Sequence, residues 1–370
     1  MRSIRVHRAA FSLPTAALLS IVVAGQSLGA TWSPAKQLTT SGTAFAEALA
    51  TVGSSTVLAV YVEHSPEMPD VPYGYAVRIR RSLDSGATWQ PPIQLSSNGL
   101  EADIAARGSN VDVVWAQGKR IRYARSTNGG QSFGSSVVLS PSGLPFSRNP
   151  SVARGPNGLV AVTWENLNTQ VAKIRISTDG GSTFGPMMNI ADVAYDMGVK
   201  VAVGNDVIHV AYAEDFDALR VVSSTDDGSS WTTPEPISDE LYGVYEQFDI
   251  VANGSRAYLA FTTENDFGVT AVEYRGTADK GASWPTAGVI ASTDANASEP
   301  SLAFTGGVLR AVYSRRSPSR VFYRQSSDGI SWSAAEKAAQ PGYEASVAFA
   351  SDIVVLYRIG TGNVFARTGS

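Results

Sequence analysis

The sequence predicts an all-β protein, a seven-bladed β-propeller built from four-stranded antiparallel blades. A turn motif, called the box below, recurs six times, and its closing aromatic residues lie 44 to 53 residues apart. This interval fits four short strands with their turns. A second aromatic column has seven members, and the two ends of the chain complement each other as parts of one repeat. A six-bladed propeller is the alternative.

Each part of the box has a physical use. In the third repeat the box reads STDGGSTF over residues 177–184. The Asp side chain can accept backbone N–H bonds within a tight turn, Gly supplies a positive φ, and the closing ring is a large apolar anchor. The six copies close on Trp89, Phe133, Phe184, Trp231, Trp284 and Trp332. Because turns between strands 3 and 4 share one face, we expect the boxes to be structural and a ligand to meet the opposite face.

An aromatic residue ends the second strand of every repeat. The column consists of Tyr61, Trp115, Trp164, Tyr212, Phe261, Tyr313 and Tyr357. Residues 31–38 look like the fourth strand of a repeat without its first three, whereas residues 343–370 look like three strands without the fourth. Together they would complete one blade and remove the exposed sheet edges of an open array. We therefore predict a single domain over residues 31–370, with its last blade closed by the N-terminal strand.

Composition and charge narrow the class of protein. The 370 residues are 44% hydrophobic and 17% charged, with 34 glycines, a balance that favours short strands and tight turns. The net charge is −4, and the body of the chain has no basic run, so we do not expect the positively charged surface that binds nucleic acid. The chain has no cysteine and few histidines, so we predict no disulfides and no thiolate or histidine-based metal site. No cofactor is expected.

The first thirty residues predict export. Basic residues precede an apolar core over residues 16–24, and small residues follow it up to Ala30. This is the pattern of a secretory signal peptide, and the apolar core is too short to span a membrane. We expect residues 1–30 to be removed and the mature protein to be secreted or periplasmic, without a membrane span.

Candidate site residues lie at the start of strand 1 and the end of strand 2. Equivalent strand-1 positions hold Glu101, Asn149, Glu299 and Glu344, with Glu47 and Glu246 one residue away. The loops between strands 2 and 3 add Glu63, His64, Glu165, Asn166, Glu214, Asp215, Arg315, Arg316 and Arg320. These carboxylates could simply solvate a channel mouth, or they could bind a cation or sugar hydroxyls or perform acid–base chemistry. The other histidine of the mature chain, His209, lies within a strand and is interpreted as a satisfied strand residue.

The box and blade pattern resembles the Asp-box, or BNR, repeats of the sialidase superfamily, over residues 31–370. The resemblance implies an acid/base carboxyl at Asp70, in the proline-rich loop of residues 63–73. It implies a nucleophile at Tyr343, which opens a strand in the last blade, with Glu246 or Glu299 as its partner. It also implies a substrate-binding arginine at Arg320, at the end of a serine-proline loop.

Two family arginines have no counterpart. Ala46 stands where the first is expected, and residues 262–264 read Thr-Thr-Glu where the second is expected. Each charge-assisted contact to a buried carboxylate contributes roughly 1.5 to 3 kcal/mol, so the loss of two argues against true sialidase activity.

The resulting hypothesis is an exported, glycan-recognising propeller with its site at the loop-side mouth. Asp70, Tyr343, Glu246 and Glu299 are the candidate catalytic groups, and Arg320, Arg315, Glu63, Glu101 and Glu344 are the candidate substrate-binding groups. Two alternatives stay open: an exo-acting glycosidase or sugar lyase that uses the same groups, and a scaffold that binds another extracellular protein.

Overall fold

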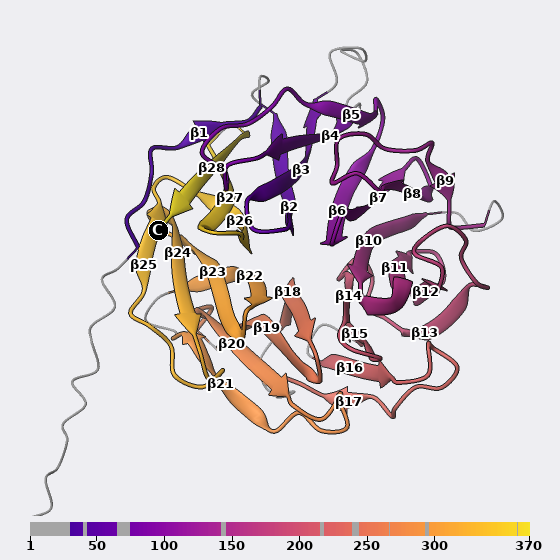
Figure 1. Ribbon diagram of the computed structural model, residues 1–370. Helices are drawn as coiled ribbons and strands as arrows, with labels where there is room; N and C mark the ends of the chain where they lie inside the picture. Colours follow the sequence, from indigo (N-terminus) through magenta and orange to yellow (C-terminus); the bar gives the residue numbers. More distant parts are fainter. Residues whose placement is uncertain are drawn as a thin grey trace, which may run out of the picture.

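The computed structural model describes residues 30–39, 43–64, 75–141, 146–214, 218–238, 244–265, 267–292, 296–360 and 362–370. Asp70, Asp215 and the predicted signal peptide up to residue 29 lie outside these ranges. Within the described ranges the chain forms seven four-stranded antiparallel sheets arranged around a central channel (Figure 1). The seven-bladed prediction is confirmed.

The innermost strand of each blade lines the channel. These strands are β2 (Ala44–Val52), β6 (Leu100–Arg107), β10 (Ser147–Arg154), β14 (Val199–Val203), β18 (Val244–Asn253), β22 (Ala297–Thr305) and β26 (Tyr343–Phe349). The second strands follow outward: β3 (Thr56–His64), β7 (Asn110–Gln117), β11 (Val160–Asn166), β15 (Ile208–Ala213), β19 (Arg256–Glu264), β23 (Val308–Arg316) and β27 (Ile353–Ile359). A short 3-10 turn, η1 (Pro156–Gly158), precedes β11.

The third and fourth strands form the outside of each blade. The third strands are β4 (Tyr75–Ser82), β8 (Arg120–Ser126), β12 (Val171–Ser177), β16 (Leu219–Ser224), β20 (Thr270–Thr277), β24 (Ser319–Ser326) and β28 (Asn363–Gly369). The outermost strands are short: β5 (Ile93–Ser96), β9 (Val137–Val138), β13 (Met188–Asp192), β17 (Glu235–Pro236), β21 (Thr286–Ala291), β25 (Glu336–Ala339) and β1 (Lys36–Gln37).

The last blade contains both ends of the described chain. Strand β1 pairs with β28, opposing Lys36 to Ala366 and Gln37 to Phe365. A further bridge joins Trp32 to Gly369. The ring is therefore closed by main-chain hydrogen bonds, which leaves the seventh sheet with the same four strands as the others.

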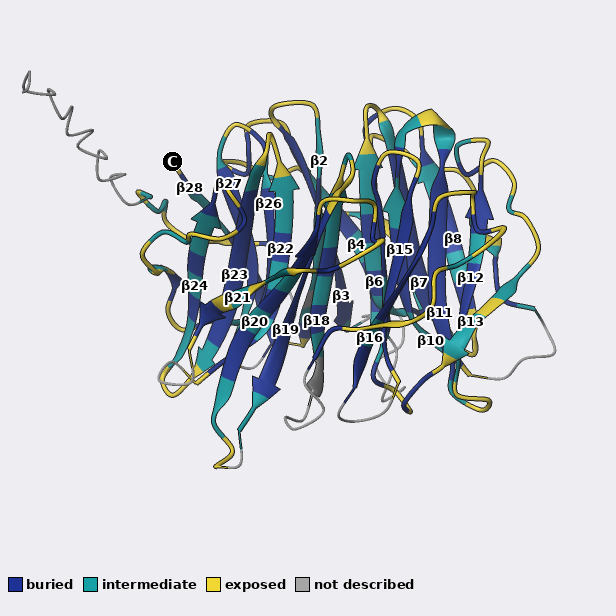
Figure 2. Ribbon diagram, turned by 90° about the horizontal axis from the view of Figure 1, so that it is seen from below, coloured by how far each residue is buried: buried dark blue, intermediate teal, exposed yellow. Residues whose placement is uncertain are grey.

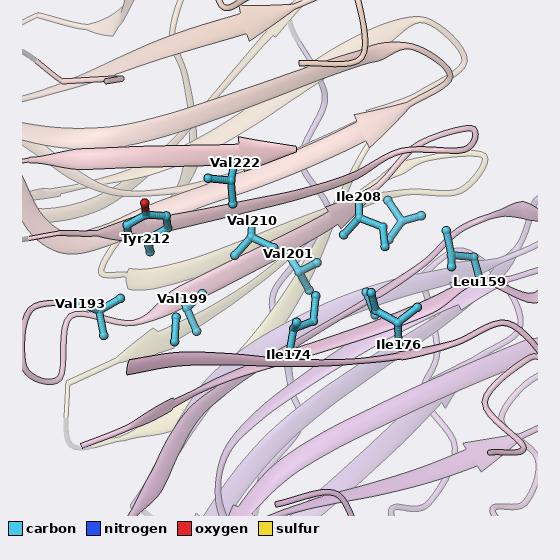
Figure 3. Packing of buried hydrophobic residues seen from close by; sticks show 13 residues of the cluster. Leu159, Ile174, Ile176, Val193, Val199, Val201, Ile208, Val210, Tyr212 and Val222 are labelled. Carbon is cyan, nitrogen blue, oxygen red and sulfur yellow. The ribbon is translucent and has the colours of Figure 1, made fainter. Parts of the chain in front are cut away.

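Buried side chains fill the space between neighbouring blades. Every member of the aromatic column is buried, between 0% and 4% exposed, and lies one to three residues before the end of its second strand rather than at the end. Blades are numbered along the chain, from blade 1 with β2 as its inner strand to blade 7 with β26. Between blades 3 and 4, Ile174 and Ile176 pack against Val201, Ile208 and Val210 (Figure 3). Similar clusters occupy the other junctions. The strands read as apolar on both faces because each sheet is covered on both sides by its neighbours.

The box folds as a hydrogen-bonded turn. In the third blade the Ser177 hydroxyl donates to Asp179 Oδ1 at 2.8 Å and accepts from the Gly181 N–H, and Asp179 Oδ1 also accepts from the Thr183 N–H at 2.9 Å. The Ser or Thr to Asp or Asn bond recurs in all six boxes at 2.6 to 2.9 Å. The closing rings are less buried than expected, because only Trp284, at 5%, is fully enclosed and the others are half-buried.

The boxes and the turns between strands 1 and 2 share one face, called the box face below. Gly180 N donates to Gly158 O, and Lys280 N donates to Ser255 O, so these boxes contact the strand 1–2 turn of their own blade. The connections between strands 2 and 3 therefore lie on the opposite face, called the mouth face. Figure 2 shows the buried strands between two layers of exposed turns. In the described part of the chain, no helix has the length and hydropathy needed to cross a membrane.

Candidate functional site

One polar residue of each blade stands at the mouth of the channel. These rim residues are Glu47, Glu101, Asn149, Asp196, Gln247, Glu299 and Glu344. They surround a cavity of about 460 Å³ to which all seven blades contribute. A volume of this size is typical of pockets that take small ligands.

A β-bulge turns the rim side chains toward the channel. The pairing of strands 1 and 2 shifts register at Glu101, Asn149, Glu299 and Glu344. All four residues adopt left-handed backbone conformations, with φ between 46° and 58°. Bulges of this kind re-aim a side chain, and they cluster next to functional sites. The structure thus places the four residues that were aligned from the sequence at equivalent points.

Most rim side chains also connect one blade to the next. Glu101 Oε2 accepts the Asn149 N–H at 2.7 Å, and Glu299 Oε2 accepts the Glu344 N–H at 2.8 Å. In blade 5 this position belongs to Gln247, whose Oε1 accepts the Glu299 N–H at 3.0 Å. The side chain of Glu246, the residue predicted from the sequence, lies outside the described residues.

A second polar ring lies deeper in the channel. Asp103, Ser151, Asp249 and Ser301 each stand two residues after a rim residue, and Lys200 on β14 follows Asp196 by four residues. Asp103 Oδ2 accepts the Val152 N–H at 2.9 Å, and Asp249 Oδ2 accepts the Leu302 N–H at 2.7 Å. Sequence reasoning missed this ring, although period-2 alternation from the rim residues would have found it.

Glu47 is the most perturbed carboxyl of the mouth. Desolvation, followed by the charge of Glu101, raises its pKa to about 8, while Lys200 opposes the shift. Because only part of Glu47 reaches the channel solvent, the neutral acid is favoured at pH 7. A carboxyl that stays protonated near neutral pH can donate a proton or a hydrogen bond to a ligand.

Glu165 closes the space behind the rim at the end of β11. It is fully buried, and its Oε2 accepts Asn149 Nδ2 at 2.8 Å and the Gly198 N–H at 3.2 Å. Its Oε1 has no hydrogen-bond partner among the described residues. Burial raises the pKa of Glu165 to about 7 against these hydrogen bonds. Asn149 also donates to Asp196 Oδ1 at 3.0 Å, so a polar network connects blades 3 and 4.

Tyr343 and Glu344 belong to an aromatic and charged cluster where blades 7 and 1 meet. The Arg358 guanidinium lies 4.3 Å from the centre of the Phe45 ring and 5.4 Å from that of Tyr343. Arg358 also pairs with Glu344 Oε2 at 2.9 Å. The Tyr343 hydroxyl donates to Gly360 O at 2.9 Å. Tyr343, Glu344, Arg358 and Phe45 are called the blade 7 cluster below.

The remaining predicted residues lie within the blades. Arg315 and Arg320 face each other across β23 and β24, and the Arg315 guanidinium stacks 4.2 Å from the centre of the Phe322 ring. Glu63, only 2% exposed, pairs with Arg78 at 3.2 Å. Of the nine predicted site residues, Glu101, Glu299 and Glu344 line the mouth cavity and Tyr343 adjoins it.

Among the described residues, no cluster of three or more His, Cys, Asp or Glu side chains has an arrangement that could hold a metal ion. The mouth carboxylates instead accept hydrogen bonds from backbone amides and pair with arginines: Arg148 with Glu101, Arg316 with Glu299, and Arg358 with Glu344. Such an arrangement presents hydrogen-bonding groups of both kinds to a polar ligand.

Comparisons with solved structures reveal shared architecture. The chain is similar to YCF48 bound to D1 peptide, with a TM-score of 0.54 and 13% identity over 91% of this chain and 94% of that one. It is also similar to a PL25 ulvan lyase, with a TM-score of 0.58 and 10% identity over 90% and 95%. Against the Hadza microbial sialidase Hz136 the TM-score is 0.52, with 13% identity over 88% and 65%.

No family model and no curated protein matches the sequence. At identities of 10 to 14%, the structural likeness establishes a propeller fold shared with sialidases and polysaccharide lyases.

Proposed function

We propose that this protein is an exported, glycan-recognising propeller whose site is the mouth of its channel, and that it lacks true sialidase activity. The observation that carries the proposal is the cavity of about 460 Å³ walled by polar side chains from seven blades. Few-residue glycans present many hydroxyl groups, and this mouth offers carboxylates and amides to accept and donate hydrogen bonds.

The blade 7 cluster supports the choice of a sugar. Tyr343 and Phe45 are half-buried aromatic residues, and Glu344 remains 38% exposed beside Arg358. Aromatic surface next to a paired carboxylate and arginine suits a ring with one apolar face and several hydroxyls. The likeness in fold to sialidases and polysaccharide lyases, and the Asp-box pattern of the sequence, agree with this class of ligand.

Three observations argue against a sialidase mechanism. The Tyr343 hydroxyl donates to a backbone carbonyl oxygen, which does not activate it as a carboxylate would. Arg315 stacks on Phe322, and Arg320 lies opposite it on the sheet. Together with Ala46 at the first arginine position, this leaves few cations for a sialic acid carboxylate.

A glycan array probed with the mature chain tests the proposal. We expect hits that weaken about tenfold in Glu344→Gln, because a charge-assisted hydrogen bond is lost. Glu235→Gln, on the outer strand β17, is the matched control and should bind like the wild type. An array without hits, or equal losses in both variants, contradicts the proposal.

Carbohydrate chemistry at the same mouth is a second candidate, favoured by Glu47. A protonated carboxyl inside a polar cavity is a frequent sign of acid–base catalysis. Fluorogenic glycosides report hydrolysis, and ultraviolet absorbance of an unsaturated sugar reports elimination. If the wild type turns over either kind of substrate and Glu47→Gln does not, the protein is an enzyme. If the wild type leaves both intact, the binding proposal alone stands.

A further inference from the structure

The mouth face of blades 2 to 4 carries a second group of exposed aromatic and basic side chains, on the far side of the channel from the blade 7 cluster. Its exposed members are Lys119, Arg120, Phe146 and Tyr195, and Arg148 beside them is partly buried. Phe146 is 43% exposed and Tyr195 is 54% exposed. Most exposed apolar side chains of a soluble protein are scattered singly. Phe146 instead precedes Arg148 by two residues, and Tyr195 adjoins Asp196, which lines the mouth cavity.

Phe146 is fixed between two blades. Its carbonyl oxygen accepts the Leu167 N–H at 2.9 Å, and the next residue, Ser147, donates its N–H to Lys119 O at 3.2 Å. Lys119 Nζ lies 4.4 Å from the centre of the Phe146 ring. The ring therefore stands beside the turn that joins β7 and β8, with a cation against one face.

The backbone around this group of residues is strained at two positions. Phe146 has a φ of 59°, an unusual value for a bulky residue, and Asp196, next to Tyr195, also has a φ of 59°. Conformations of this kind cost of order 1 to 3 kcal/mol each and concentrate where ligands are held. At Phe146 the strain serves no buried packing, because the ring is exposed.

The charges of this group differ between its outer end, at Lys119 and Arg120, and its inner end, at Arg148 and Asp196. Arg148 is neutralised by Glu101, and its pKa is raised mainly by that hydrogen bond. Lys119 and Arg120 form no ion pair within the described residues, although the whole chain carries a net charge of −4. Asp196 lies toward the channel, where Asn149 donates to it. An anionic group on a ligand is therefore expected at the Lys119 end.

We propose that Lys119, Arg120, Phe146, Arg148 and Tyr195 form a second glycan subsite, the blade 3 subsite, which takes a sugar bearing a carboxylate or a sulfate. The proposal rests on the proposed function and specifies its ligand: an anionic oligosaccharide that extends from the channel mouth across blades 2 to 4. Tyr195 and the free face of Phe146 contact the rings of the sugar, and Lys119 and Arg120 attract its charge.

Calorimetric titration of the mature chain with three hexasaccharides tests the subsite. The probes are hexagalacturonate, a chondroitin sulfate hexasaccharide and neutral cellohexaose. We expect at least one anionic probe to bind about tenfold more tightly than cellohexaose in 50 mM NaCl, and the advantage to shrink in 500 mM NaCl because salt screens exposed charges. The two anionic probes distinguish carboxylate from sulfate recognition.

Matched charge reversals locate the effect. Lys119→Glu should weaken binding of the preferred anionic probe about tenfold, and Tyr195→Ala should weaken it several-fold. Arg107→Glu, at the end of β6 on the box face, makes the same change in net charge and should leave the affinity unchanged. Thermal melting of each variant verifies that the fold is intact.

Several results would overturn the subsite. These are equal affinity for neutral and anionic probes, equal losses in Lys119→Glu and Arg107→Glu, or binding of polyglutamate as tightly as of the preferred sugar. If array hits are lost in Glu344→Gln but the Lys119 and Tyr195 variants behave like the wild type, the mouth site stands and the subsite fails. If no glycan binds at all, both proposals fail together.

Discussion

The two faces of the propeller use repetition in opposite ways. On the box face the same hydrogen bonds recur, so that the side chains of Ser177 and Asp179 and their counterparts differ little from blade to blade. On the mouth face the backbone recurs instead: the same left-handed bulge presents Glu in blades 2, 6 and 7 and Asn in blade 3. The repeated side chains of the box face stabilise the ring of blades. The side chains that vary on the mouth face are the ones that can contact a specific ligand.

The largest expected effect comes from the box-side half of blades 2 and 3. Asp112 is fully buried and accepts hydrogen bonds from Tyr123 and Arg154. Asp112→Ala leaves the Arg154 charge without its partner, so we expect a loss of about 3 to 5 kcal/mol in the free energy of unfolding. Urea denaturation measures this loss. A loss below 1 kcal/mol would contradict the structural role assigned to the box face.

Two glycines with nearly the same φ separate backbone strain from steric crowding. Gly181 in the box has a φ of 82°, and Gly198 at the mouth has a φ of 83°. A Cβ at Gly181 would collide with the Tyr123 hydroxyl, whereas around Gly198 the described atoms leave open space. We expect Gly181→Ala to cost roughly 1 to 3 kcal/mol more than Gly198→Ala, since both lose the left-handed preference but only one is overpacked. Equal costs in thermal melting would contradict this.

Low pH is expected to destabilise the fold through His209, a buried residue between blades 4 and 5. Burial lowers the pKa of His209 to about 4, and its Nδ1 lies 2.8 Å from Ser223 Oγ. The neutral folded form is stabilising above the unfolded pKa of about 6.5, and this stability is lost as the pH falls toward 4. We expect about 2 kcal/mol less stability at pH 5 than at pH 7.5 from this group. His209→Gln should flatten that part of the urea-midpoint profile.

The mouth carboxyls respond to pH with the opposite sign. Desolvation raises the pKa of Glu47 to about 8 and that of Glu165 to about 7, above their usual range near 4.5. The contribution of these two carboxyls to the free energy of unfolding is fully present below about pH 4.5 and is lost as the pH rises through 7 to 8. Glu47→Gln should therefore raise the urea midpoint more at pH 8 than at pH 5. A uniform shift across pH would show that Glu47 is ionised throughout.

The smallest expected effect on stability belongs to the blade 7 cluster. Glu344 is 38% exposed in its pair with Arg358, and half-exposed ion pairs contribute about 0 to 1 kcal/mol. Glu344→Gln should thus change the free energy of unfolding by less than about 1 kcal/mol while it weakens glycan binding about tenfold. If unfolding suffers and binding does not, the contrast between the two faces is wrong.

The repeat made the fold predictable from sequence. Six boxes and an aromatic column give the blade count directly, and the rim alignment placed Glu101, Asn149, Glu299 and Glu344 at equivalent bulges. The prediction of Glu246 missed the rim by one residue, because Gln247 holds the rim position in blade 5. The bulge in this blade adds a residue to one strand, and a fixed repeat length in the sequence does not show where it is added.

The site was harder to predict because its contacts cross between blades. Asp196 escaped the alignment because it lies before β14, four residues ahead of Lys200, whereas the aligned rim residues lie two residues ahead of their second-ring residues. The joining of Tyr343 to Phe45 through Arg358 depends on the closure of the ring. Asp70 lies outside the described residues, so its role stays a prediction. Spacing within one repeat carries no information about which side chains of another repeat lie opposite.

The pairing of β1 with β28 also bears on how fast the molecule can form. Gln37 Nε2 contacts Asn363 Oδ1 across 326 positions of sequence, whereas each other blade is made of consecutive segments. Local hairpins form within microseconds, but a contact this distant must first overcome the entropy of a very long loop. The seventh blade is therefore expected to be the last to acquire native order, and the six contiguous blades to precede it.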